Sequence, residues 1–257
     1  MAPLIVILGE TASGKTAAGI KLALQIGGEI ICADSRTIYK HLDIGTAKPM
    51  SKEQQGVPHH LLDILNPDQK FSAAQFKQKA TGIIDDIWAR GHFPIMVGGT
   101  GLYLDSVLFD FQFAGQDAPK NPDNPRHLMK SEGSAARKLR ESTFVCGLTV
   151  DRELLKERIT ARVGQMFNDG FLDEIKEVTA TYGWDNESMS GIGYRVAREY
   201  FNESASLEDV KQAFISRDTS LAKRQRTWFR RNPHIKWFKQ ADQLIKEAGE
   251  FSAGFRV

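Results

Sequence analysis

The sequence predicts an α/β fold in which helices flank a parallel sheet, followed by a helical C-terminal portion. Over the first hundred residues, short apolar runs that stop at Gly or Asp alternate with segments of helical periodicity. This alternation is typical of parallel strands joined by crossover helices. After residue 148 the periodicity becomes almost wholly helical. A stretch with three prolines, 115–126, interrupts the pattern, and we expect it to be a loop or linker.

The first part of the chain contains three predicted strands and two predicted helices. Each strand is a short continuous apolar run, as expected for a strand buried on both faces of a sheet. Ser72 and Gln75 predict a capping box at the start of the second helix. In chain order, the predicted elements are 4–8, 15–26, 29–33, 73–90 and 93–97.

The second part begins with a predicted strand at 143–148. A helix starts near Asp151, a second ends before Gly183, and a third, capped by Ser206, runs into a basic segment. The first of these helices is expected to bury one face, made of Leu154, Leu155, Ile159, Val163 and Met166. We therefore divide the chain into the first part of the core (1–114), the linker (115–135), and the rest of the core with the helical C-terminal portion (136–257).

Composition excludes several classes of protein. With 257 residues, 41% of them apolar and 26% charged, the chain is not expected to be disordered. No apolar run reaches the ~20 residues needed to cross a bilayer, and the apolar start has no basic leader, so we expect neither a membrane span nor a signal peptide. Two cysteines, Cys32 and Cys146, cannot build a disulfide framework or a four-cysteine zinc site. We expect a cytoplasmic location.

Residues 9–16, Gly-Glu-Thr-Ala-Ser-Gly-Lys-Thr, match the phosphate-binding pattern G-x-x-x-x-G-K-[ST] between a predicted strand and a predicted helix. Glycines let backbone N–H groups point inward as an anion nest at a helix N-terminus. Lys15 adds a mobile positive charge, and the Thr16 hydroxyl can ligate Mg²⁺. A glycine-rich turn alone would not explain Lys15 and Thr16, so we predict that this P-loop binds phosphate groups.

The carboxylate predicted beside this loop is Asp34, at the end of the strand 29–33. Ligands gather at that edge of open α/β sheets. An ordinary P-loop ATPase or GTPase has an apolar strand ending in an Mg²⁺-binding Asp, but the strand 93–97 is followed by Gly-Gly-Thr-Gly. Asp34 is either a catalytic base or the N-cap of the next turn, and its position alone does not decide between the two.

Two smaller clusters have competing interpretations. His59 and His60, followed by Asp63, lack a third metal ligand at suitable spacing, which favours structural histidines. Arg158 and Arg162 lie four residues apart on a predicted helix. They either clamp a diphosphate or pair with acidic neighbours on the helix surface, and spacing favours the pairing.

The net charge of +2 conceals a basic segment, 217–239, with eight Lys or Arg residues and a single acid. Such a segment is typical of a polyanion-binding surface, although a solvated helix face is the ordinary alternative. Trp228, Phe229, Trp237 and Phe238 lie among these charges and are expected to supply stacking surfaces. The helical phase of Trp228 also allows it to pack in the core.

Several separate motifs along nearly the whole chain resemble the tRNA dimethylallyltransferase (tRNA isopentenyltransferase) family. Besides the P-loop, they are Ala-Asp-Ser-Arg-Thr-Ile-Tyr at 33–39, Leu-Asp-Ile-Gly-Thr-Ala-Lys-Pro at 42–49, Pro-His-His-Leu-Leu-Asp-Ile at 58–64, Val-Gly-Gly-Thr-Gly-Leu-Tyr at 97–103, Gly-Tyr-Arg at 193–195 and Ala-Lys-Arg-Gln-Arg-Thr-Trp-Phe-Arg at 222–230. The resemblance implies a P-loop NTPase-like fold and transfer of a dimethylallyl group from its diphosphate to N6 of the adenosine 3′ of the anticodon. It also implies Mg²⁺ as cofactor, the tRNA anticodon stem-loop as partner and no membrane; we expect a monomer.

The resemblance further implies a role for each matching residue. The catalytic set is Asp34 as general base with Thr16, Lys15 and Arg162, and Thr16 is the metal ligand. The donor diphosphate would be bound by the loop residues Gly9, Glu10, Thr11, Ala12, Ser13, Gly14, Lys15 and Thr16. The tRNA-binding set is Asp34, Ser35, Arg36, Thr37, Thr100, Arg126, His127, Lys130, Gly193, Tyr194, Arg195, Lys223, Arg224, Gln225, Arg226, Trp228 and Arg230.

The sequence departs from the family pattern at three places. Glu10 stands where the family usually has Pro, and Thr219 stands where Arg is common. Between Phe113 and Asn121 the helical insertion of typical members is almost absent, so this chain is expected to be a short form with a reduced insertion. Three alternatives stay open: prenylation of free AMP or ADP, a small P-loop kinase, and a non-catalytic RNA-binding module.

Overall fold

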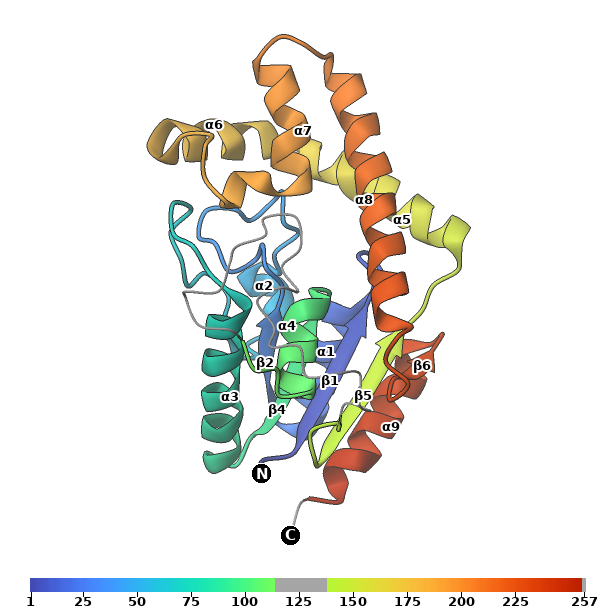
Figure 1. The fold of residues 1–257 in the computed structure, drawn as a ribbon. Coiled ribbons are helices and arrows are strands. Elements are labelled where there is room, and N and C mark those ends of the chain that lie inside the picture. The colour runs from blue at the N-terminus through green and yellow to red at the C-terminus, as the bar shows by residue number, and fades with distance from the viewer. Residues whose placement is uncertain (114–137, 256–257) are drawn as a thin grey trace.

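The computed structural model describes residues 1–113 and 138–255. Strands and helices alternate in the first part, and the second part is mainly helical (Figure 1). The elements are β1 (Leu4–Gly9), α1 (Lys15–Ile26), β2 (Gly28–Ala33), α2 (Ser51–Gln54), β3 (His59–His60), α3 (Ala73–Ala89), β4 (Phe93–Gly98), α4 (Gly101–Leu108), β5 (Thr143–Leu148), α5 (Arg152–Asn168), α6 (Phe171–Tyr182), η2 (Ser188–Ser190), α7 (Ile192–Phe201), α8 (Leu207–Phe229), β6 (Lys236–Phe238) and α9 (Ala241–Ala253). Each predicted strand and helix is present, and the loop predicted at 115–126 lies outside the described residues.

Within the described residues, six strands form one parallel sheet in the order β3-β2-β4-β1-β5-β6. The central strand β1 pairs with β4 on one side and β5 on the other, so that Ile7 faces Val97 and Cys146 across the two ladders. Since all the strands run in one direction, their carboxyl ends meet at one edge. The loops after β1, β2 and β4 are therefore neighbours in space.

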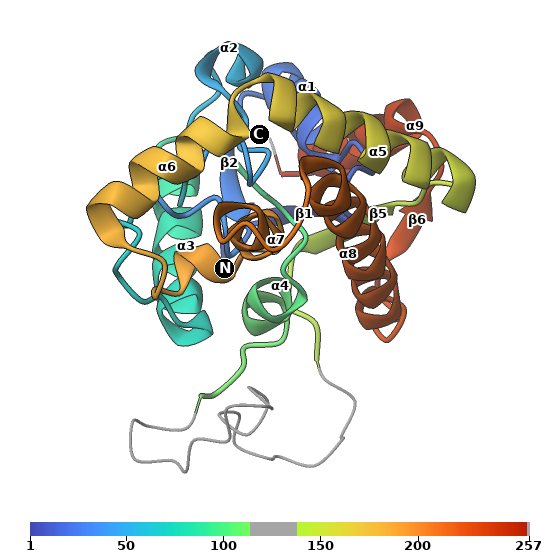
Figure 2. The same cartoon turned by 90° about the horizontal axis from the view of Figure 1, so that it is seen from above.

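Helices cover both faces of the sheet, as Figure 2 shows from above. Alternate residues of β1 point to opposite faces. Leu4, Val6 and Leu8 pack into a core that includes side chains of α3 and α4, whereas Ile5 and Ile7 pack into a second core with α1 and α9. The predicted α/β architecture with a buried parallel sheet is thus confirmed.

The helices α5, α6 and α7 and the first half of α8 stand beyond the carboxyl ends of the strands (Figure 1). Phe171 and Phe214 from these helices belong to the same core cluster as β1. The second half of α8 descends beside the sheet toward β6. The helical C-terminal portion therefore covers the carboxyl edge of the sheet, which is the edge where ligands bind in this class of fold. No helix in the described ranges is long and apolar enough to cross a membrane.

Three side chains differ from their predicted environments. Leu154 is 43% exposed, because the buried face of α5 follows the phase of Leu155 and Ile159. Phe229 and Phe238 are only 1% and 5% exposed, since each packs into one of the two cores. The prediction that these two phenylalanines offer stacking surfaces is therefore wrong.

Candidate active site

The P-loop joins β1 to α1 at the carboxyl edge of the sheet. Gly14 caps α1 in the left-handed region (φ 91°), a conformation that suits glycine. Lys15 donates from Nζ to the backbone oxygen of Glu10 at 3.2 Å, so its side chain curls over the loop. The loop thus combines the N-terminus of a twelve-residue helix with a lysine ammonium group, and both attract anions.

Lys15 is an unusually weak base in this setting. Desolvation lowers its pKa to about 8, helped by the positive charge of Arg162 and opposed by the carboxylates of Asp34 and Glu10. A bound anion would favour the charged form of Lys15 and raise its pKa. The ammonium group is therefore tuned to a negatively charged ligand.

Two adjoining cavities open beside the loop, one of about 520 Å³ and one of about 740 Å³. Both are lined by Lys15, Asp34 and Arg162, which come from α1, the end of β2 and α5. The structure thus brings together the lysine, the carboxylate and one of the two arginines singled out in the sequence. Arg158 lines neither of these cavities.

The two cavities differ in chemistry. The larger one has an apolar wall that includes Ile20, Leu24, Ile30 and Val97. Cys32 belongs to this wall, and burial raises the pKa of its thiol to about 12, so the thiol stays protonated. The smaller cavity has a more polar lining than the larger one, and this lining includes Ser35, Arg36, Thr100, Arg195 and Arg224.

Asp34 is half-buried and already uses one carboxylate oxygen, because its Oδ1 accepts a hydrogen bond from the backbone N–H of Arg36 at 2.8 Å. The capping interpretation is therefore correct for Oδ1. Oδ2 makes no hydrogen bond within the described part of the chain, and the residue lines both cavities. One oxygen orients the side chain, and the other is available to a ligand.

The Gly-Gly-Thr-Gly turn after β4 lets α8 approach closely. A Cβ at Gly99 would come within 2.5 Å of the Gln225 side chain, and a Cβ at Gly101 would collide with the Trp228 ring. Gln225 bridges two loops, since its Oε1 accepts from the backbone N–H of Thr11 at 2.8 Å and its Nε2 donates to Gly99 O at 3.0 Å. This turn positions the wall of the cavity and supplies no metal-binding carboxylate.

Comparison with known proteins identifies this arrangement. Residues 37–142 and 124–232 match the family model described as IPP transferase. The chain belongs to the IPP transferase family.

The chain is 38% identical to the tRNA dimethylallyltransferase of Carboxydothermus hydrogenoformans, over 96% of this chain and 97% of that relative. Among solved structures, it is similar to the full-length tRNA isopentenylpyrophosphate transferase of Bacillus halodurans, with 33% identity and a TM-score of 0.84 over 99% of this chain and 96% of that one. It is also similar to the tRNA delta(2)-isopentenylpyrophosphate transferase of Staphylococcus epidermidis, with 29% identity and a TM-score of 0.86 over the whole of both chains.

The sequence patterns miss one residue of this IPP transferase site, Asp218. Its Oδ2 accepts a hydrogen bond from Nη2 of Arg162 at 2.6 Å, and its side chain is 8% exposed. Burial raises the pKa of Asp218 above its usual range, opposed by the Arg162 charge. Nε of Arg162 is buried and has no hydrogen-bond partner among the residues that the structure describes. Because the two residues lie 56 positions apart on α5 and α8, helical spacing could not reveal the pair.

Glu10 and Arg226 are predicted to bind the donor and tRNA, yet they bind each other. Both nitrogens Nε and Nη2 of Arg226 donate to the two carboxylate oxygens of Glu10, the second at 2.8 Å. The Glu10 side chain is 4% exposed and that of Arg226 18%. The roles of Glu10 and Arg226 in binding the donor and tRNA stay predictions, and their ion pair ties the P-loop to α8 at the position where the family usually has proline.

Other predicted tRNA contacts divide into exposed and buried residues. Tyr194 is buried and donates its hydroxyl to Glu174 at 2.7 Å, and Gly193 is buried against Phe214. These two therefore shape the cavity from within the core. Among the predicted tRNA contacts, four basic side chains are exposed to solvent: Arg195, Lys223, Arg224 and Arg230.

Trp228 donates from Nε1 to Asp105 at 2.8 Å and is half-buried beside the core, so core packing is the better description of its role.

Ser35, Arg36, Thr37 and Thr100 lie together at the ends of β2 and β4. Ser35 donates its backbone N–H to Thr100 Oγ1 at 3.0 Å, and Arg36 donates from Nη1 to Glu187 O at 2.9 Å. Thr37 is 7% exposed, and its Oγ1 has no hydrogen-bond partner within residues 1–113 and 138–255. Arg126, His127 and Lys130 lie outside the described residues.

His59 and His60 both form hydrogen bonds within the fold, as expected for structural histidines. Nδ1 of His59 lies 2.8 Å from Val57 O, and Nε2 of His60 lies 2.6 Å from Glu29 Oε2. Asp63 instead pairs with Lys48. Among the described residues, no group of three or more His, Cys, Asp or Glu side chains could hold a metal ion.

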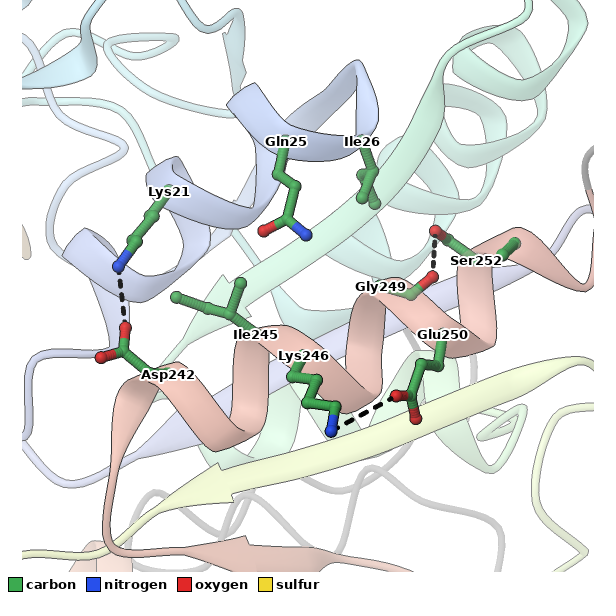
Figure 3. A pocket seen from close by; sticks show the side chains of 10 residues that line it. Lys21, Gln25, Ile26, Asp242, Ile245, Lys246, Gly249, Glu250 and Ser252 are labelled. Carbon is green, nitrogen blue, oxygen red and sulfur yellow. Dashed lines mark hydrogen bonds and ion pairs between the residues drawn. The ribbon is translucent and has the colours of Figure 1, made fainter.

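A separate cavity of about 490 Å³ lies between α1 and α9 (Figure 3). Lys21 pairs with Asp242 at 2.7 Å and Lys246 with Glu250 at 4.0 Å, so its charged side chains already neutralise one another. Of the predicted site residues that the structure describes, none lines this cavity. This cavity takes no part in the candidate active site.

Proposed function

We propose that this protein transfers a dimethylallyl group from dimethylallyl diphosphate to N6 of the adenosine adjacent to the 3′ side of the anticodon in tRNA, releasing diphosphate. The observation that carries this proposal is the meeting of Lys15, Asp34 and Arg162 where a cavity with an apolar wall adjoins a more polar one. A prenyl diphosphate has an apolar tail and an anionic head, and a nucleobase needs polar contacts. The two cavities match these needs.

The donor diphosphate is bound by the amide groups of the P-loop, Lys15 and Arg162. The apolar wall around Ile20, Leu24 and Val97 excludes water from the dimethylallyl group. Excluding water matters because water would otherwise compete with N6 as nucleophile. Arg162 lines both cavities, and its positive charge would stabilise the negative charge that develops as the diphosphate departs.

The transfer forms a C–N bond and breaks a C–O bond at C1, and one proton moves from N6 to the base. N6 of adenine attacks C1 of the dimethylallyl group, and the C1–O bond electrons leave with the diphosphate. Oδ2 of Asp34 accepts the proton from N6. Reaching N6 requires the adenine to leave the anticodon stack, and the smaller cavity beside Ser35, Thr100 and Arg224 is where we place it.

The residues present fit Mg²⁺ as cofactor. Thr16 lies in the first turn of α1, and its hydroxyl and the Asp34 carboxylate are hard oxygen donors on residues that line the same cavity. We propose Thr16 as the protein ligand, with diphosphate oxygens completing the site. Mg²⁺ bound there would supply positive charge beside the leaving group.

Several broader features belong to the same proposal. The alignment with the Carboxydothermus relative is 303 positions long, more than the 257 residues of this chain, so that relative has residues that this chain lacks. We propose that the missing residues belong to an insertion reduced here to 115–135, between core parts 1–114 and 136–257. We also propose a cytoplasmic monomer that binds the anticodon stem-loop.

The deciding experiment incubates the protein with Mg²⁺, dimethylallyl diphosphate and unmodified tRNA, then digests the tRNA and analyses its nucleosides by mass spectrometry. We expect one adenosine per tRNA to gain a dimethylallyl group. Parallel reactions with AMP as competing acceptor and with ATP in place of the prenyl donor test the adenylate prenyltransferase and kinase alternatives. Preferential prenylation of AMP, or consumption of ATP without prenyl transfer, would contradict the proposal.

A further inference from the structure

A cavity of about 400 Å³ lies near the C-terminal turns of α8, outside the active site. We call it the Trp237 pocket; its lining residues are Glu10, Thr149, Val150, Asp151, Arg152, Arg226, Arg230 and Trp237. It shares no lining residue with the two active-site cavities. Its volume lies in the range of small-ligand pockets. The Trp237 pocket has no part in the proposed transfer reaction.

The end of α8 separates this pocket from the active site. Arg224, Gln225 and Trp228 line the smaller active-site cavity, whereas Arg226 and Arg230 line the Trp237 pocket. Nearby residues of this helix, which is about 10–12 Å wide with its side chains, therefore line both cavities. An RNA strand that places one base in the active site therefore has neighbouring nucleotides within reach of the other side of α8.

Trp237 offers a supported ring surface in this pocket. Across the parallel ladder it pairs with Gly147, and a Cβ at Gly147 would come within 2.6 Å of two carbons of the indole. The indole thus rests on the backbone of β5, and yet Trp237 keeps 38% of its surface exposed. A ring held by backbone on one side is pre-organised for stacking on the other.

The charges around the indole favour an anion. Arg152 and Arg230 are exposed and make no ion pair within the described ranges. Arg226 forms an ion pair with Glu10. Asp151 is therefore the one acidic residue of the described lining that has no such partner in it. Two available guanidinium groups beside one carboxylate give net positive charge, and guanidinium is well suited to phosphate oxygens.

We propose that the Trp237 pocket binds one unpaired nucleotide of the RNA acceptor close to the modified adenosine, with its base stacked on Trp237 and its phosphate contacted by Arg152 and Arg230. This inference rests on the proposed function, because it requires RNA as the acceptor. It assigns the basic segment two separate contacts with the RNA, one on each side of α8. An indole beside two available arginines matches a nucleotide better than it matches a purely apolar ligand.

Binding of a synthetic anticodon stem-loop RNA, measured by fluorescence anisotropy, tests the stacking. Base–aromatic stacking is worth enough that Trp237→Ala and Trp237→Leu should raise Kd roughly 5- to 150-fold, while Trp237→Phe should retain most of the affinity. Leucine still covers Gly147 with an apolar side chain, so Trp237→Leu should keep the melting temperature of the wild type. A loss of RNA affinity in that variant then reports lost stacking and not lost folding. Trp184→Leu is the control, because Trp184 packs against Phe201 outside all three cavities.

The nucleotide is located by replacing each loop residue of the RNA, one at a time, with an abasic one. At one position near the target adenosine, the penalties of the abasic site and of Trp237→Ala should fail to add, because both remove the same stack. Arg152→Gln and Arg230→Gln should each reduce the slope of log Kd against log salt by about 0.7. Lys246→Gln, on the far surface of α9, should leave the slope unchanged.

The proposal is overturned if wild-type protein prenylates this RNA but Trp237→Leu binds it with wild-type affinity, or if the penalties add at every position. If the wild-type protein prenylates no RNA, the proposed function fails instead. These two failures have different signatures, because only the first leaves prenyl transfer to RNA intact.

Discussion

The P-loop and the end of α8 meet at the same cavity, but they are held there in different ways. The loop is shaped by local backbone contacts, such as the Ser13 N–H donating to Glu10 O at 3.2 Å. The end of α8 is held by side chains that reach distant parts of the chain: Gln225 bonds Thr11, and Arg226 pairs with Glu10. The backbone shape of the P-loop therefore depends on local contacts, whereas the position of the end of α8 depends on long-range contacts, several of them with the P-loop itself.

This difference implies that substitutions in the two regions fail in different ways. Changes beside the loop should impair the reaction in a folded protein. Changes on the inward side of α8 should impair stability, and changes on its outward side should impair RNA binding alone. The predictions below test that division.

The largest effect is expected for Asp34→Asn. Asparagine can still accept the hydrogen bond from the Arg36 N–H through Oδ1, but it cannot take the proton from N6. Loss of a general base typically lowers the rate 10²- to 10⁴-fold, and the Kd for RNA should stay near that of the wild type. Single-turnover prenyl transfer measures the step directly. A near-normal rate would show that another group is the base.

On the α8 side, Arg226→Gln should lower the free energy of unfolding by about 3 kcal/mol, because it leaves the buried Glu10 carboxylate without a partner. The double variant Glu10→Gln/Arg226→Gln should recover most of that loss. The matched control is Arg224→Gln, at an exposed residue two positions earlier, which should change RNA binding and leave stability unaffected. Urea unfolding of the three variants checks this, and equal stability of Arg226→Gln and Arg224→Gln would remove the distinction between the two sides of the helix.

The same difference explains which features the sequence could predict. The P-loop, the strands and the Ser72 capping box depend on contacts within a few residues, and all are present as predicted. The ion pairs of Glu10 with Arg226 and of Arg162 with Asp218 join segments 216 and 56 residues apart. A charge pattern identifies the basic segment, but it cannot tell which of its arginines has an internal carboxylate as partner.

The pH dependence of donor binding should follow Lys15. Its pKa of about 8 means that the free protein loses this charge as the pH rises through 8, and a diphosphate prefers the charged form. The Kd for dimethylallyl diphosphate should therefore be flat below pH 8 and rise up to tenfold per pH unit above it. Lys15→Arg should flatten this profile, since arginine stays protonated. Isothermal titration calorimetry across pH 6.5–9.5 would make the measurement, and a profile unaffected by Lys15→Arg would assign the titration to another group.

The smallest effect, about tenfold, is expected for Asp218→Asn, and its direction sharpens the comparison most. Asp218 both orients Arg162 and offsets its charge. Asparagine keeps the shape but removes the negative charge, so the site becomes more positive and the inhibition constant of product diphosphate should fall severalfold. The charge-assisted hydrogen bond that orients Arg162 weakens at the same time, and kcat should fall about tenfold. A purely structural carboxylate would instead lower the melting temperature and weaken diphosphate binding together with kcat. A fall in both constants, which means tighter diphosphate binding together with slower turnover, would assign Asp218 to the donor site, although it comes from the helix that forms the acceptor wall.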